Sequence, residues 1–133
     1  MNQLPHPSVL IVEDDGLIAM HLTEVLEKAG YDVMKPENSG EKAIARLQAP
    51  PYPDIILMDI GLNGKLDGIE TARQIRKNYD IPIVFLTAYS DEERIVKAAE
   101  VSPYGYLIKP CTGDEILNTV KEILQIEDKA ILS

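Results

Sequence analysis

The chain has 133 residues, 45% of them hydrophobic, which predicts one domain whose core needs neither disulfides nor a structural metal. With 22 acidic and 13 basic residues the formal charge is −9, which disfavours direct binding to nucleic acid or to anionic membranes. The single cysteine, the absence of a signal-like start and the absence of any apolar run near roughly 20 residues favour a soluble, cytoplasmic protein.

Residues 1–7 carry two prolines and no periodic pattern, so we expect a flexible N-terminal tail. Short apolar runs then recur along the chain. They lack polar alternation, which is typical of strands buried on both faces of a parallel sheet, and one more polar run fits an edge strand. The expected strands are 9–12, 31–35 (the edge), 54–58, 83–86 and 106–108.

Between the strands, apolar residues are spaced by three or four positions, as in helices that bury one face. The first expected helix ends at Gly30, the fourth covers 91–101 and the fifth covers 112–126. Asp15 is interpreted as the N-cap of the first helix rather than as a ligand. Capping pairs are expected at Asn38/Glu41, Asp67/Glu70, Ser90/Glu93 and Thr112/Glu115.

Strict alternation of strands and helices predicts an α/β fold, with a parallel sheet, right-handed crossovers and helices on both faces. We expect the domain to occupy residues 8–127, with a short tail at 128–133 and no output domain.

Polar side chains follow the apolar runs at the end of each strand, where open parallel sheets bind their ligands. Glu13 and Asp14 follow the first run, Asp59 the third, Thr87 the fourth and Lys109 the fifth. Each residue alone has an ordinary structural interpretation as a cap, a strand residue or a solvated charge. Their joint placement at one rim favours a functional site.

Carboxylates brought close together repel one another, and a bound cation such as Mg²⁺ relieves that repulsion. Mg²⁺ also leaves coordination positions for phosphate oxygens. Phosphoryl transfer needs a nucleophile and neutralisation of charge. We therefore expect Asp59 to attack, Lys109 and the metal to neutralise the phosphoryl oxygens, and Thr87 to donate a hydrogen bond.

With these residues in this order, the chain resembles a response-regulator receiver domain of two-component signalling, of the stand-alone type. The resemblance covers nearly the whole chain, and the motifs are specific as an ordered set. The matching stretches are VLIVEDD (9–15), DIILMDI (54–60), DGIETARQIR (67–76), PIVFLTA (82–88) and YGYLIKP (104–110).

The resemblance implies a flavodoxin-like (βα)5 sandwich with strand order 2-1-3-4-5. It also implies that Mg²⁺ is held by Glu13, Asp14, Asp59 and the backbone carbonyl of Gly61. The loop at 61–68 looks one residue longer than is usual in the family and lacks the family's Met-Pro turn.

The resemblance further implies that Asp59 accepts a phosphoryl group from the phosphohistidine of a sensor histidine kinase or histidine phosphotransfer domain. Thr87 and Lys109 then contact that group, and Tyr106 acts as an aromatic switch that turns inward when Thr87 moves. The protein is expected not to be an enzyme beyond self-phosphorylation and autodephosphorylation. It is expected to be a monomer or a weak phosphorylation-dependent dimer, with an unknown downstream protein target.

Three alternative functions make different demands on the sequence. A phosphatase of the haloacid-dehalogenase type needs a second Asp two residues after the nucleophile, where this chain has Gly61. A flavodoxin-like nucleotide or flavin binder needs a Gly/Ser/Thr-rich phosphate loop, where this chain has acidic residues. A receiver-like interaction module that is never phosphorylated stays open, although the intact set of site residues argues against it.

Overall fold

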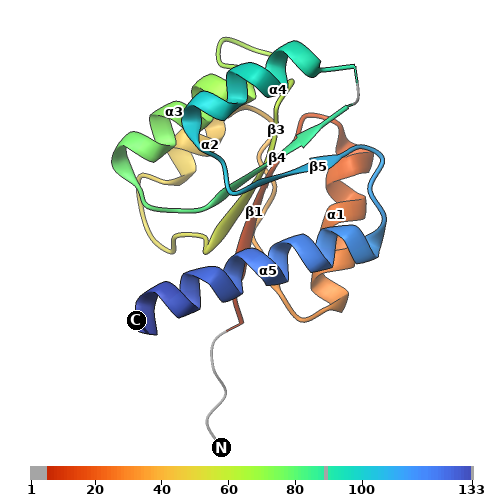
Figure 1. Cartoon of the computed structure of the whole chain (residues 1–133), viewed down its shortest axis with the longest axis vertical. Coiled ribbons are helices and arrows are strands. Elements are labelled where there is room, and N and C mark those ends of the chain that lie inside the picture. Colours follow the sequence, from red (N-terminus) through yellow and green to blue (C-terminus); the bar gives the residue numbers. More distant parts are fainter. Residues whose placement is uncertain (1–5, 89, 133) are drawn as a thin grey trace, which may run out of the picture.

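The computed structural model describes residues 6–88 and 90–132, which form a parallel sheet between two layers of helices (Figure 1). The strands are β1 (Ser8–Val12), β2 (Asp32–Val33), β3 (Ile55–Asp59), β4 (Ile83–Thr87) and β5 (Gly105–Ile108). The helices are α1 (Gly16–Lys28), α2 (Gly40–Arg46), α3 (Gly68–Asn78), α4 (Glu92–Ala98), a short 3-10 helix (Ala99–Val101) and α5 (Gly113–Leu132).

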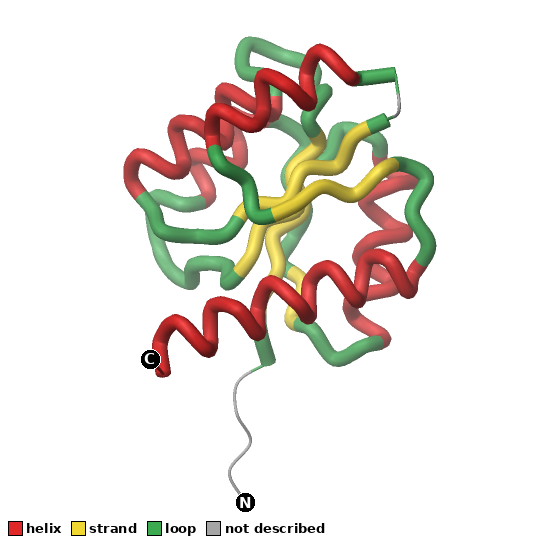
Figure 2. The backbone as a smooth tube through the Cα atoms, in the orientation of Figure 1, coloured by secondary structure: helices red, strands yellow, loops and turns green. Residues whose placement is uncertain are grey.

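The five strands lie in the order β2-β1-β3-β4-β5, and every neighbouring pair is parallel. The strands, yellow in Figure 2, lie in the middle of the molecule with red helices on either side. Both the predicted fold class and the predicted strand order are confirmed. The first and third strands are central neighbours, and Val12 pairs in register with Met58. The residues that follow β1 and those that end β3 therefore meet at one edge of the sheet.

Alternate residues of each central strand enter two separate cores, which explains the continuous apolar runs. Leu10 and Val12 of β1 pack in the core beneath α2, α3 and α4, whereas Val9 and Ile11 pack in the core beneath α1 and α5. All four side chains are fully buried. Burying one aliphatic side chain of this size contributes roughly 1.5–3 kcal/mol, so both faces stabilise the sheet.

Several helix ends follow the predicted capping chemistry. The Asp15 carboxylate accepts hydrogen bonds from the backbone of Leu17 and Ile18, at 2.9 and 3.3 Å, which confirms it as an N-cap. Gly30 follows the first helix with a φ of 95°, as expected for a glycine that ends a helix. The Asp67 carboxylate caps α3, and Thr112 and Glu115 exchange hydrogen bonds in a reciprocal capping box.

Two predicted caps are wrong by one residue. Ser39, not Asn38, caps α2, and its hydroxyl accepts from the Lys42 N–H at 3.2 Å. Asp91, not Ser90, precedes α4, and its side chain makes no capping hydrogen bond to the helix. In each pair the two adjacent residues have similar capping preferences, so the path of the backbone selects between them.

The boundaries also differ from expectation at the edges of the fold. The edge strand covers Asp32–Val33 rather than 31–35. The last helix continues through Leu132, so residues 128–132 of the expected tail at 128–133 are helical, and Ser133 lies outside the described residues. Of the predicted tail at 1–7, only His6 and Pro7 lie within the described residues, and the Pro7 carbonyl accepts a hydrogen bond from Asp32 N–H at 2.9 Å. Tyr89 lies outside the described residues.

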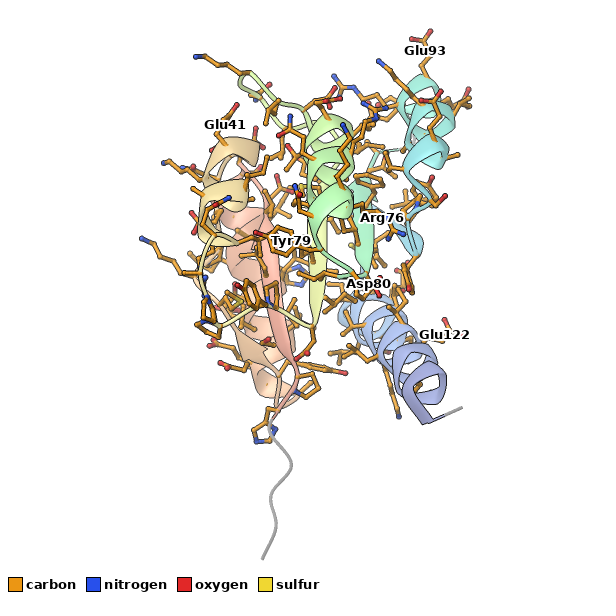
Figure 3. All side chains as sticks on the ribbon, turned by 90° about the vertical axis from the view of Figure 1, so that its left-hand side faces the viewer. Glu41, Arg76, Tyr79, Asp80, Glu93 and Glu122 are labelled. Carbon is orange, nitrogen blue, oxygen red and sulfur yellow. The ribbon has the colours of Figure 1, made fainter. Side chains whose placement is uncertain are left out.

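The side chains labelled in Figure 3 lie at different heights along the sheet. Glu41 of α2 and Glu93 of α4 lie at one end, and Tyr79 and Asp80, which follow α3, lie further toward the other (Figure 3). The Tyr79 hydroxyl donates to the Leu47 carbonyl at 2.7 Å and ties α3 to the end of α2.

Over the described ranges, no helix is long and apolar enough to cross a membrane.

Candidate functional site

Three carboxylates converge at the carboxyl edge of the sheet. Glu13 and Asp14 directly follow β1, and Asp59 is the last residue of β3. Because β1 and β3 are in-register neighbours, each of the three carboxylates places an oxygen within 4.8 Å of the other two. Glu13 and Asp59 are buried, and Asp14 is partly exposed. The structure thus brings together the acidic residues that the sequence singled out.

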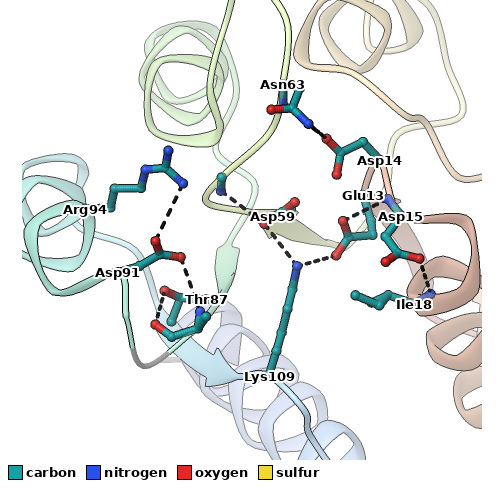
Figure 4. Close-up of polar contacts among 12 residues, drawn as sticks. Glu13, Asp14, Asp15, Ile18, Asp59, Asn63, Thr87, Asp91, Arg94 and Lys109 are labelled. Atoms are coloured by element: carbon teal, nitrogen blue, oxygen red, sulfur yellow. Dashed lines mark hydrogen bonds and ion pairs between the residues drawn. The ribbon is translucent and has the colours of Figure 1, made fainter.

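Lys109 reaches this cluster from the end of β5 (Figure 4). Its Nζ atom lies 2.7 Å from Oε1 of Glu13 and 3.2 Å from Oδ1 of Asp59. Burial acts to lower the pKa of Lys109, but the two carboxylates outweigh it and the pKa is raised. The lysine therefore stays charged and can neutralise an anionic group bound at the cluster.

Glu13 is the member of the cluster whose charged form is disfavoured by burial. Burial, reinforced by the charge of Asp59 and opposed by Lys109, raises the pKa of Glu13 from 4.5 to about 7. Lys109 lies close to Oε1 but outside hydrogen-bond alignment. Within the described part of the chain, this buried oxygen has no hydrogen-bond partner. The Lys109 ammonium is the ion-pair partner of Oε1, and a bound divalent cation would add further positive charge at this buried carboxylate.

Asp14 has a lowered pKa, and it is held by Asn63, a residue that the sequence patterns did not single out. Asn63 donates to Oδ2 of Asp14 from its backbone N–H at 3.1 Å and from its side-chain amide at 2.9 Å (Figure 4). Burial acts to raise the pKa of Asp14, but the Asn63 backbone hydrogen bond and neighbouring contacts outweigh it and the pKa is lowered. Asp14 is therefore ionised when Glu13 is partly protonated.

The donor set fits a hard divalent cation. It offers three carboxylates, one of them with a buried oxygen that lacks a hydrogen bond, and no soft sulfur ligand. Glu13, Asp14 and Asp59 are the residues that would hold Mg²⁺. Gly61, two residues after Asp59, donates its N–H to Oδ1 of Asp59 at 3.1 Å. Its carbonyl remains the predicted backbone ligand.

Thr87 and Tyr106 lie on adjacent strands beside the cluster. Thr87 is the last residue of β4, is 1% exposed, and donates its hydroxyl to the Ala88 carbonyl at 3.3 Å. Tyr106 pairs in register with Phe85, two residues before Thr87. The two rings pack with their centroids 6.2 Å apart, and Tyr106 is partly buried against the core. The Tyr106 ring therefore contacts the core while the residue stays partly exposed.

The loop at 61–68 is shaped by one contact between distant segments and by two glycines. The Glu41 carboxylate of α2 accepts from the Leu66 N–H at 2.9 Å. Gly64 adopts a φ of 121°, and Gly68 packs so closely that a Cβ there would collide with the Asp59 carbonyl and lie 2.8 Å from the Ile60 Cα. The glycines in GLNGKLDG were the available signal, because the backbone conformation of Gly64 and the close packing of Gly68 both disfavour a side chain.

Comparison with known proteins identifies this arrangement. The profile of the response regulator receiver domain family matches residues 9–121. The chain belongs to that family. The receiver domain is 33% identical over 113 residues to the transcriptional regulatory protein PdtaR of Mycobacterium tuberculosis, a match that covers 85% of this chain and 54% of the relative. It is 36% identical over 125 residues to the transcriptional regulatory protein ResD of Bacillus subtilis, covering 94% and 51%.

A solved structure shares the fold closely. The N-terminal domain of a response regulator/sensory box/GGDEF 3-domain protein from Carboxydothermus hydrogenoformans is 35% identical to this receiver domain. The two superpose with a TM-score of 0.85 over 93% of this chain and 98% of that one. This receiver domain spans about half the length of the curated relatives it matches.

Proposed function

We propose that this receiver domain is a phosphoacceptor of a two-component or phosphorelay system, with Asp59 as the acceptor. One observation carries the assignment. Among the rim carboxylates of the described residues, only the Asp59 side chain ends a central strand, faces Lys109 at 3.2 Å and shares the acidic cluster. A nucleophilic carboxylate beside a cation is what phosphoryl transfer requires.

The reaction follows from these positions. An oxygen of Asp59 attacks the phosphorus of a phosphohistidine, the P–N bond breaks, and the imidazole leaves with the electron pair of that bond. Lys109 neutralises a phosphoryl oxygen, and the Thr87 hydroxyl donates to another. When bound at the acidic cluster, Mg²⁺ supplies charge neutralisation for the phosphoryl oxygens.

The donor is proposed to be a sensor histidine kinase or a histidine phosphotransfer domain. Exposed apolar side chains beside the site support a protein donor. Leu17 and Met20 of α1 are 77% and 57% exposed. Leu17 also lines a hollow together with His21, Lys109 and Cys111. Apolar groups gathered beside an acidic acceptor favour docking of a protein rather than of a small ion.

The signal is proposed to leave through α4, β5 and α5 as a change in packing around Thr87 and Tyr106. Val96 of α4 is 75% exposed and Ile108 of β5 is 36% exposed, so this face offers apolar contacts to a downstream protein. Movement of Thr87 toward a phosphoryl group would change the space beside the Tyr106 ring, which biases two packing states. We propose a monomer, or a dimer that forms weakly on phosphorylation.

We further propose that the protein acts in the cytoplasm and is not an enzyme beyond its own phosphorylation and dephosphorylation. The single cysteine supports a reducing compartment.

The test is incubation with acetyl phosphate and Mg²⁺, followed by intact-mass measurement. One acid-labile phosphoryl group is expected on the wild type and none on Asp59→Asn. Labelling that persists in Asp59→Asn would overturn the acceptor assignment. A wild type that takes no label from acetyl phosphate or from phosphohistidine would favour an interaction module that is never phosphorylated. Amide exchange that changes only around the acidic rim would overturn the proposed exit face.

A further inference from the structure

An arginine of α4 reaches across the site toward the acceptor. Figure 4 shows the Arg94 side chain extending from α4 toward Asp59. A Cβ placed on Gly61 would lie 2.5 Å from Nη1 of Arg94 and 3.8 Å from Oδ1 of Asp59. The guanidinium therefore occupies the space that the missing Gly61 side chain leaves open. Because both distances start from one point, Nη1 and Oδ1 are at most about 6 Å apart, close enough for charges to interact.

The present partner of Arg94 holds it weakly. Its Nη1 atom lies 3.7 Å from Oδ1 of Asp91, and the Arg94 side chain is 51% exposed. Ion pairs of this exposure contribute little to stability. The Asp91 carboxylate has a second contact, since its Oδ2 accepts from the Ala88 N–H at 3.4 Å. The guanidinium can therefore change partner at small cost.

Phosphorylation would supply a better partner. Conversion of the Asp59 carboxylate to an acyl phosphate adds negative charge and three oxygen acceptors at the site. The planar guanidinium suits phosphoryl oxygens because it donates two parallel hydrogen bonds. We propose that Arg94 leaves Asp91 when Asp59 is phosphorylated and binds the phosphoryl oxygens from the space over Gly61, an inference that rests on the proposed function of Asp59.

This exchange connects the acceptor to α4 by a route separate from Thr87 and Tyr106. Asp91 immediately precedes α4, and its carboxylate holds the backbone of Ala88, the residue after β4. When Arg94 moves to the phosphoryl group, Asp91 loses its cation and α4 gains a direct link to the site. The first turn of α4 thereby responds to phosphorylation.

The experiment uses beryllofluoride with Mg²⁺ as a stable stand-in for the phosphoryl group on Asp59, with binding followed by calorimetry on the full chain. Arg94→Gln is expected to weaken beryllofluoride binding about fivefold to tenfold. Arg94→Lys keeps the charge but loses the fork, so it is expected to weaken binding by less. Lys77→Gln is the control for net charge. Lys77 lies in the last turn of α3, whereas the first residue of that helix is the one packed on Asp59, so this variant should bind beryllofluoride like the wild type.

A coupling test isolates the space over Gly61. Gly61→Ala keeps the backbone carbonyl but places a methyl group where Nη1 of Arg94 now lies. It is expected to weaken beryllofluoride binding in the Arg94 background and to have little further effect in the Arg94→Gln background. Equal effects in the two backgrounds would contradict the proposed position of the guanidinium.

The outcomes separate this inference from the function on which it rests. A wild type that binds no beryllofluoride would count against the Asp59 assignment itself. A wild type that binds, together with an Arg94→Gln variant that binds equally well, would overturn only the role of Arg94. Mg²⁺ affinity alone should be unchanged or slightly higher in Arg94→Gln, since a cation is removed. A parallel loss of Mg²⁺ affinity would indicate a structural role and overturn the proposal.

Discussion

Nζ of Lys109 lies 3.2 Å from Oδ1 of Asp59, although β4 separates the strands that lead to the two residues. A short side chain at position 109 could not span that gap. The contact places a charged donor against the proposed acceptor, so little reorganisation would be needed in the proposed transfer.

Removing this cation should slow phosphorylation. Lys109→Met keeps most of the length of the side chain and loses its charge, and we expect the rate of labelling by acetyl phosphate to fall about 100-fold, the loss typical of one transition-state donor. Intact mass against time measures the rate. Lys121→Met, an exposed change on α5, is the matched control. A rate within twofold of the wild type in both variants would exclude Lys109 from the reaction.

Mg²⁺ binding should depend on pH through Glu13, whose pKa is raised from 4.5 to about 7, chiefly by burial. A cation binds the carboxylate form, so below about pH 7 binding must release a proton and the apparent affinity falls with falling pH. Above that pH the affinity levels off. Calorimetry across this range measures the slope, and Glu13→Gln should bind more weakly and with a flatter profile.

The same shift sets the sign of the pH effect on metal-free stability. The folded state holds the Glu13 proton more tightly than the unfolded chain does, so protonation of Glu13 adds to the free energy of unfolding. This stabilisation is complete below pH 4.5 and is lost as the pH rises through about 7. Glu13→Gln should remove that part of the pH dependence in thermal unfolding without Mg²⁺. An unchanged profile in Glu13→Gln would contradict the assignment of the raised pKa to this residue.

Asn63 should support Mg²⁺ binding without being a ligand. Asn63→Ala loses the side-chain hydrogen bond of 2.9 Å that orients Asp14 but keeps the backbone bond, so we expect a loss of affinity of a few fold. Asn118→Ala, an exposed change on α5, is the control and should bind normally. If both variants bind Mg²⁺ equally well, the Asn63 amide does not orient the site.

Gly68 should tolerate no side chain. Ala at this position would collide with the Asp59 carbonyl and crowd the Ile60 backbone, which we expect to cost about 1–3 kcal/mol in the free energy of unfolding. Gly16→Ala is the comparison, because a Cβ there meets nothing within 4 Å and helical Ala is favoured over Gly. Thermal unfolding of both variants checks the contrast. Equal midpoints would show that the loop moves aside freely.

Local chemistry made much of this protein predictable. The apolar run at β1 identifies a buried strand because every residue of 9–12 has a core to enter. Asp15, Asp67 and Thr112 cap helices because their side-chain oxygens satisfy backbone N–H groups that have no partner within the helix. Where two neighbours could both cap, as at Asn38 and Ser39, local preference did not suffice.

Spacing and interactions between near neighbours suffice to predict the strands, the helices and the residue types that meet at the carboxyl edge. The contacts between segments far apart in the chain become visible only in the folded protein: Asn63 with Asp14, Glu41 with the Leu66 backbone, and Arg94 with the space over Gly61. The physical reason is that a polar pair between distant segments leaves no periodic trace in the chain. Its geometry exists only after the two cores have fixed the loops around the sheet.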